Sequence, residues 1–160
     1  MRDYRPQAEK NRFEKLLQSF AQTRFGGSLF LGVFPAIDRR LIPLTHGRLS
    51  TGLGSRSCCC TRSGIERTVS LLATKTGETI LLVASKAGSP RHPAWLHNVR
   101  AHPDVEVTIE GRRRPMRAEI ASGAARERFW HVVCDNYSGY ATYQRRAGHR
   151  LIPVVALAPR

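Results

Sequence analysis

The stretch Val83–Asn98 carries the densest set of groups in the chain that could hold a ligand. An apolar run ends here in Ala-Ser-Lys, and Ala87–Pro90 then reads as a turn of small residues. A strand that gives way to such a turn exposes main-chain groups, a hydroxyl and an ammonium group at one sheet edge. Pro93 suits the first turn of a new helix, because the N–H that it lacks would have no helical partner there. We therefore expect a ligand-binding corner made of a strand end, a loop and a helix start.

Two groups of basic residues flank strands of the expected sheet. If the strands over 56–61 and 79–85 are near neighbours, these side chains converge on one edge and suit a phosphate or a carboxylate tail. No glycine-rich nucleotide-binding loop accompanies them, which excludes the commonest nucleotide folds but leaves a flat-ring cofactor held in a barrel groove. The basic residues are Arg62, Arg67, Lys86 and Arg91, and Ser63 adds a hydroxyl beside the first two.

Three tyrosines recur at steps of three, namely Tyr137, Tyr140 and Tyr143. On one side of a short helical or turn segment they would wall a pocket and donate hydrogen bonds. The alternative is that they form the edge of a core with their hydroxyls at the surface. We interpret Trp95 and Trp130 as packing residues.

The histidines and cysteines do not have metal-site spacing. His92 and His97 are five residues apart, not the four of a helical ligand pair, and the consecutive Cys58–Cys60 would alternate faces on a strand. No Ser-His-Asp arrangement or pair of carboxylates stands out. We expect no metal, and a catalyst with so few titratable groups would leave the chemistry to a cofactor.

The charge is strongly positive: 26 Lys and Arg against 12 Asp and Glu give a formal net charge of +14. This favours an anionic partner, whether a ligand, a membrane face or a nucleic acid, although an arginine-rich composition also fits a GC-rich genome. The N-terminus does not read as a signal peptide, and we expect the most apolar run, Ser28–Ile37, to be too short to span a membrane. We expect a cytoplasmic protein.

The N-terminal part reads as helical, with Phe13, Leu16, Leu17 and Phe20 at helical spacing among basic residues. Such a helix would pack on its own domain or lie peripherally on the inner face of the cell membrane. We expect residues 1–47 to be a helical extension and residues 48–160 to be the main domain.

The main domain reads mostly as strands. Hairpins and sparse crossovers predict an antiparallel, barrel-like sheet with helices packed around it, an α+β fold. The expected strands are Ser57–Thr61, Thr68–Thr74, Thr79–Ser85, Val105–Glu110, Arg113–Glu119 and Leu151–Leu157. A turn is expected at Lys75–Glu78, and helices are expected at Pro93–Ala101 and at Ser122–Cys134 with Ser122 as N-cap.

Three stretches resemble the deazaflavin-dependent nitroreductase family. They are LLVASKAGSPRHPAWLHNVRAHPDVEVTI, NYSGYATYQRRAGHRLIPVV and SGIERTVSLL. Members of this family are small actinobacterial oxidoreductases that use the 5-deazaflavin coenzyme F420. The resemblance implies a split β-barrel of the flavin-reductase or pyridoxamine-phosphate-oxidase type. It also implies F420 as the cofactor, with FMN as the alternative.

The family's site positions can be matched motif by motif. Cofactor-binding positions match Thr61, Arg62, Ser63, Arg67, Thr68, Val69, Ser70, Leu71, Leu72, Val83, Ala84, Ser85, Lys86, Ala94, Trp95, Leu96, His97, Asn98 and Tyr140. Substrate-binding positions match Ser85, Tyr137, Tyr140 and Tyr143, of which Ser85 and Tyr140 are the expected catalytic residues.

The resemblance implies an oxidoreductase that transfers a hydride from reduced F420 to a small acceptor, which would be a quinone, an enone or a nitroaromatic compound. Two alternatives stay open. One is a split-barrel carrier that holds F420 without turnover, and the other is a basic nucleic-acid-binding module. With an anionic cofactor to account for the basic residues, we expect no nucleic-acid partner. The oligomeric state is open.

Overall fold

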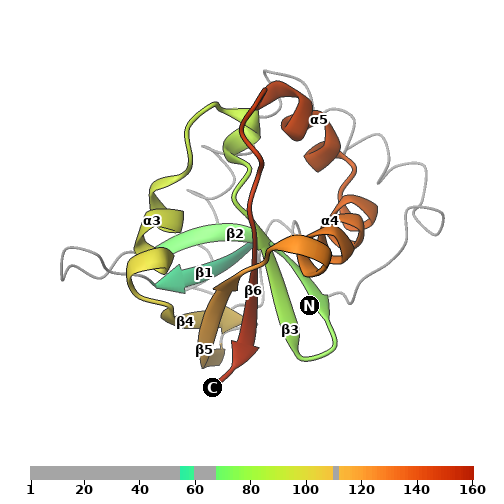
Figure 1. Cartoon of the computed structure of the whole chain (residues 1–160). Helices are drawn as coiled ribbons and strands as arrows, with labels where there is room; N and C mark the ends of the chain where they lie inside the picture. Colours follow the sequence, from blue (N-terminus) through green and yellow to red (C-terminus); the bar gives the residue numbers. More distant parts are fainter. Residues whose placement is uncertain (1–54, 60–67, 110–111) are drawn as a thin grey trace.

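The strands form an antiparallel barrel around a packed interior (Figure 1). The computed structural model describes residues 55–59, 68–109 and 112–160, so the expected N-terminal extension lies outside the described residues. The barrel closes in the order β1-β2-β3-β6-β5-β4, and each neighbouring pair is antiparallel. The strands are β1 (Ser55–Cys59), β2 (Thr68–Thr76), β3 (Thr79–Val83), β4 (Asp104–Ile109), β5 (Arg112–Ile120) and β6 (Val154–Pro159).

The two expected helices interrupt this sheet in the expected order, and the tyrosine segment, which could have been helix or turn, forms a further helix. Three strands precede a helix, two strands follow it, and two further helices precede the last strand. Helices α4 (Gly123–Asn136) and α5 (Gly139–Arg146) lie on the same side of the barrel, apart from α3 (Ala94–Ala101) (Figure 1). The helical segments of the described residues are the short turn η2 (Lys86–Gly88), α3 (Ala94–Ala101), α4 (Gly123–Asn136) and α5 (Gly139–Arg146). The prediction of an antiparallel barrel with surrounding helices is confirmed.

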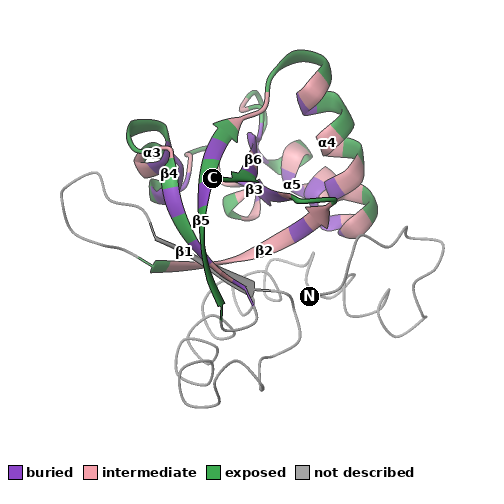
Figure 2. Cartoon of the chain, turned by 90° about the horizontal axis from the view of Figure 1, so that it is seen from below, coloured by how far each residue is buried: buried purple, intermediate pink, exposed green. Residues whose placement is uncertain are grey.

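Strand β3 is buried on both faces and divides two hydrophobic cores. Because side chains alternate along a strand, Ile80 and Leu82 enter the barrel interior while Leu81 and Val83 face the helices. Each of the four is less than 9% exposed, which explains why this strand reads as an uninterrupted apolar run. Figure 2 shows the buried residues gathered toward the barrel interior and toward the face of α4 and α5 that meets it.

The first hairpin differs from the prediction at both of its strand ends. Strand β2 continues to Thr76, so the turn is only Gly77–Glu78, where the positive φ of 58° at Gly77 favours glycine. Strand β3 stops at Val83, two residues before the expected end at Ser85.

The last strand starts three residues later than predicted, at Val154. The segment before it makes other hydrogen bonds: Ile152 N–H donates to the Gln144 side chain at 2.9 Å, and Pro153 has no N–H to give to a ladder. The predicted helix positions agree with α3 and α4, and Ser122 stands at the N-cap of α4 without a side-chain capping bond. No helix in the described ranges is both long and apolar enough to cross a membrane.

Candidate functional site

The two strands of the first hairpin separate at the end where the predicted site residues lie. Strand β2 pairs with β3 from Ala73 to Thr76, whereas its residues from Thr68 to Leu72 pair with β1. The other edge of that first half of β2 is therefore outside the β2–β3 ladder. Since β2 lies between them, β1 and β3 are not direct neighbours, and the basic residues Arg62 and Arg67 that follow β1 lie outside the described residues, with Thr61 and Ser63.

The predicted residues of β2 divide between its two faces. Val69 and Leu71 pack against the barrel core, and Leu72 packs against the core on the helix side. By the alternation of the strand, Thr68 and Ser70 share the face of Leu72. The side chains of Val69 and Leu71 therefore contribute to the packing of the barrel core, and the other set faces the side of α5.

After β3 the chain makes a turn with left-handed backbone. Lys86 and Ala87 have φ values of 47° and 52°, and Gly88 follows with 81°. A non-glycine residue in this region costs about 1–3 kcal/mol, so the neighbouring structure must hold the turn in place. A Cβ on Gly88 would lie 2.7 Å from Arg146 Cβ and 2.8 Å from the Tyr143 carbonyl oxygen, so only glycine lets the turn pack this closely on α5. The Lys86 side chain is exposed there.

One arginine binds both ends of this turn. Arg150 Nη2 donates to the Ser85 carbonyl at 2.8 Å, Nη1 to the Ala84 carbonyl at 3.1 Å, and Nε to the Ser89 carbonyl at 2.8 Å. In the part of the chain that the structure describes, no carboxylate lies within salt-bridge distance of this guanidinium. The sequence prediction did not include Arg150, because a single arginine before a strand has no distinctive spacing.

His92 completes the contacts of Arg150. Its Nδ1 lies 3.3 Å from Arg150 Nη1, and because a guanidinium can only donate, Nδ1 must accept. Burial lowers the pKa of His92, and the positive charges of Arg150 and Arg100 and the neighbouring His97 lower it further. The ring is therefore neutral at pH 7, with its proton on Nε2.

Helix α3 contributes both core and surface residues to the predicted set. Trp95 and Leu96 are buried in the barrel core, which confirms the interpretation of Trp95 as a packing residue. Ala94 and His97 are exposed and Asn98 is half-buried, so these three are the ones accessible from solvent. Val83 and Ala84 are likewise buried, and the Ala84 main chain is occupied by Pro153 and Arg150.

The tyrosines form one buried cluster on the helix side of β3. The ring centres of Tyr137 and Tyr140 lie 5.1 Å apart, and the ring of Tyr143 is 6.1 Å from the first and 6.4 Å from the second. Burial, with the hydrogen bond to Tyr143 next, raises the pKa of Tyr137, and burial raises the pKa of Tyr140. Both phenols are therefore protonated at neutral pH and can donate hydrogen bonds.

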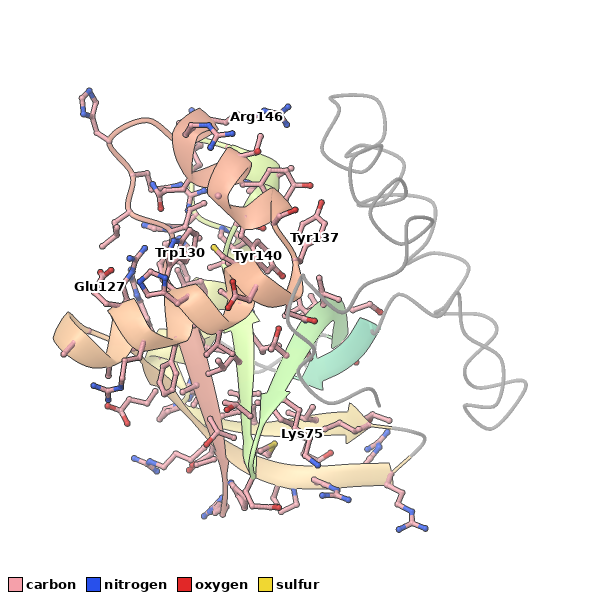
Figure 3. All side chains as sticks on the ribbon, turned by 90° about the vertical axis from the view of Figure 1, so that its right-hand side faces the viewer. Lys75, Glu127, Trp130, Tyr137, Tyr140 and Arg146 are labelled. Carbon is pink, nitrogen blue, oxygen red and sulfur yellow. The ribbon has the colours of Figure 1, made fainter. Side chains whose placement is uncertain are left out.

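Two contacts hold this cluster, one to the sheet and one at the start of α5. Asn136 Nδ2 donates to Thr74 Oγ1 at 2.9 Å, which holds the end of α4 on β2. The ring of Tyr137 then folds over Gly139, where a Cβ would lie 2.3 Å from the ring carbon Cζ. Figure 3 shows Tyr137 and Tyr140 where α4 meets α5, with Lys75 at the opposite end of the barrel.

Other features of the described residues do not add to this site. A surface hollow of about 420 Å³ is lined by β4, β5 and Arg160 and shares no residue with the predicted site. Burial, and then the charge of Asp135, raises the pKa of Cys134 to about 11, so its thiol is a poor nucleophile. Within the described ranges no cluster of three or more His, Cys, Asp or Glu side chains suits a metal ion.

Comparison with known proteins finds relatives that are described as F420H(2)-dependent quinone reductases. An F420H(2)-dependent quinone reductase of Mycobacterium tuberculosis is 40% identical over 100 residues, a match that spans 59% of this chain and 64% of the relative. Another M. tuberculosis protein with the same description is 34% identical over 99 residues, spanning 62% of this chain and 82% of its own length. The match to the first relative thus covers less than two thirds of that protein.

Solved structures show the same fold. An F420-H2 dependent reductase, FDR-A, superposes with a TM-score of 0.61 at 34% identity, covering 65% of this chain and 93% of its own. A structure described as a domain-swapped dimer gives a TM-score of 0.64 at 32% identity, covering 76% and 93%. The family model for F420H(2)-dependent quinone reductase matches residues 57–159, which include all the described strands and helices except the first two residues of β1. The chain therefore belongs to the F420H(2)-dependent quinone reductase family.

Proposed function

We propose that this protein is an F420-dependent oxidoreductase that reduces quinones. The observation that carries the proposal is the meeting of three elements at one end of the barrel. The first half of β2, the turn at Lys86 and helix α5 lie together, since Leu72 and Ala87 pack on the tyrosine cluster and Gly88 packs on α5. Family membership supplies the cofactor, as two relatives are described as F420H(2)-dependent quinone reductases.

Residues of the described part suit an anionic, flat-ring cofactor. The exposed ammonium group of Lys86 would bind its negatively charged tail, and the edge of β2 near Ser70, which lies outside the β2–β3 ladder, would offer main-chain groups to its ring. Ala94, His97 and Asn98 would close one end of the site from helix α3. When bound, reduced F420 supplies a hydride that, with one proton, turns a quinone into a hydroquinone.

The protein's own contribution would be to orient the acceptor and exclude water. Ser85 is half-buried at the strand end, and its hydroxyl would bind a carbonyl of the acceptor. Tyr137 and Tyr140 are neutral phenols, and Tyr143 lies in the same cluster. One of these three would hydrogen-bond the oxyanion that develops on the quinone. Enones and nitroaromatic compounds carry similar acceptor oxygens and belong to the proposed substrate range.

The test is a titration followed by turnover. Oxidised F420 is added to the protein and its fluorescence followed, and reduced F420 with menadione is then followed by the return of the oxidised absorbance. We expect binding at micromolar F420 and protein-dependent reoxidation. Failure to bind at that concentration would overturn the proposal, and binding without turnover over a panel of quinones, enones and nitroaromatics would indicate a carrier.

A further inference from the structure

The turn that carries Lys86 is held by a residue more than sixty positions away in the sequence. Arg150 binds the carbonyls of Ala84 and Ser85 before the left-handed residues and that of Ser89 after them. Together with the contact to His92, four of its five N–H groups are directed at the segment 84–92. Figure 1 shows the chain before β6 running beside the chain after β3, which brings the two segments together.

These contacts oppose the strain of the turn. Lys86 and Ala87 adopt a left-handed backbone conformation that residues other than glycine rarely take. They stay in it only where contacts with the surrounding structure hold the backbone there. Hydrogen bonds within the turn are few: Gly88 N–H donates to the Ser85 carbonyl and Ser89 N–H to the Lys86 carbonyl, each at 3.0 Å. Of the contacts described, those of Arg150 tie both ends of the turn to another segment.

Arg150 is itself fixed in position. Gln144 of α5 donates to the Arg150 carbonyl at 2.8 Å and accepts from Ile152 N–H at 2.9 Å, so the segment that carries the guanidinium is anchored to the helix of the tyrosines. A planar guanidinium with donors in a fixed fork can bind three carbonyls at once, whereas an ammonium group cannot reproduce that geometry.

We propose that Arg150 is a positioning residue, which locks the strained turn Ser85–Ser89 in the conformation that presents Ser85 and Lys86 to the cofactor and the acceptor. This inference rests on the proposed function for its effect on F420, but the locking of the turn is independent of it. Without Arg150 the turn relaxes, and the cofactor must then order it on binding, which weakens affinity.

Two measurements test the proposal on Arg150→Ala, with Arg117→Ala as the matched control. Arg117→Ala removes the same charge, but Arg117 bonds to Asp104 across the β4–β5 pair and its side chain is 64% exposed. The first measurement is the rate at which trypsin cuts the Lys86–Ala87 bond in the folded protein, which needs no cofactor. The second is the dissociation constant for oxidised F420, with kcat and the two KM values for reduced F420 and menadione.

For Arg150→Ala we expect the cleavage rate and the dissociation constant to rise about tenfold or more, equivalent to about 1.4 kcal/mol. The KM for reduced F420 should rise with them, while kcat changes by less than about threefold because the chemistry is left to the bound reactants. Added guanidinium ion at millimolar concentration should restore part of the affinity, which a general loss of packing would not allow. Arg117→Ala should match the wild type in every measurement.

If Arg150→Ala does not fold, Arg150→Lys takes its place, with the same expectations at smaller size. An unchanged cleavage rate in a folded variant would overturn the proposal, and so would faster cleavage with unchanged affinity for F420. If the wild type does not bind F420 at all, the proposed function fails, while the cleavage rate still decides whether Arg150 holds the turn.

Discussion

The hydroxyl oxygens of Tyr137 and Tyr143 lie 3.1 Å apart, inside a cluster where both residues are less than 10% exposed. Tyr137 precedes α5 and Tyr143 lies in its second turn, so the bond ties the helix to the ring of Tyr137. Because each phenol has a single proton, one hydroxyl donates to the other and the acceptor keeps its own proton for another partner. In the proposed function a phenol of this cluster would bind the carbonyl oxygen of the quinone.

We predict that Tyr137→Phe and Tyr143→Phe each destabilise the fold by about 0.5–1.5 kcal/mol, the net value of a buried hydrogen bond. The double variant should cost less than the sum, because both changes remove the same bond. Chemical unfolding of the three variants measures this coupling, and strict additivity would contradict a shared bond.

The pH dependence should follow from His92. Its pKa is lowered by burial and by the positive charges of Arg150 and Arg100, so the ring is neutral at pH 7. Below the ordinary histidine pKa of about 6.5 the unfolded chain takes up the proton first, so stability falls as the pH decreases through that value. Once His92 itself is protonated, Nδ1 no longer accepts from Arg150, and affinity for F420 falls as well.

The measurement is the unfolding free energy and the F420 dissociation constant between pH 5 and 8. We expect both to be nearly constant above pH 7. Toward pH 5 the unfolding free energy should decrease and the dissociation constant should increase. In His92→Phe the acid dependence should be smaller, since the titrating ring facing Arg150, Arg100 and His97 is gone. An identical acid profile in that variant would assign the effect to other groups.

Lys86→Ala should weaken the binding of oxidised F420 by about tenfold while the protein stays folded, because it removes a charge-assisted contact from an exposed side chain. Its affinity should also depend less on salt than that of the wild type. Lys75→Ala is the control: it removes the same charge at the opposite end of the barrel (Figure 3) and should leave binding unchanged. Equal affinities for wild type and Lys86→Ala would remove this lysine from the site.

Hydrophobic periodicity was sufficient to predict the order of the elements, but not their ends. The end of β3 at Val83 and the start of β6 at Val154 depend on contacts outside their own strands: Ala84 N–H donates to the Pro153 carbonyl, far along the chain, and Ile152 N–H donates to the Gln144 side chain on α5. Such contacts leave no trace in the local pattern, because the residues just outside the observed strands, 84–85 and 151–153, read equally well as strand.

The site was predictable in its segments and less so in its individual residues. Alternation along β2 separates two sets of side chains, yet the sequence does not say which set faces the helices, because β3 is apolar on both faces. Arg150 was missed for a related reason, since its hydrogen-bond partners lie 58 to 66 residues away. The roles of Ser85, Lys86 and the tyrosines stay predictions that the variants above test.

Gly139 provides the sharpest test of the packing around the tyrosines. A Cβ there would lie 2.3 Å from Tyr137 Cζ and 2.4 Å from its hydroxyl oxygen, so Gly139→Ala must displace the ring. The displacement breaks the bond to Tyr143 and overpacks a buried site, at an expected cost of about 1–3 kcal/mol. It should raise the KM for menadione, while the affinity for oxidised F420 changes less because Lys86 and Arg150 are untouched.

The control removes the obstacle instead of the glycine. Tyr137→Ala leaves no ring for the new Cβ to meet, so adding Gly139→Ala in that background should cost almost nothing or even stabilise the helix, where alanine is preferred to glycine. Unfolding free energies of the wild type, both single variants and the double variant give the coupling between the two positions. A full loss of stability on Gly139→Ala in the absence of the Tyr137 ring would contradict this. It would mean that the glycine is needed for its backbone conformation and not for the space that the ring occupies.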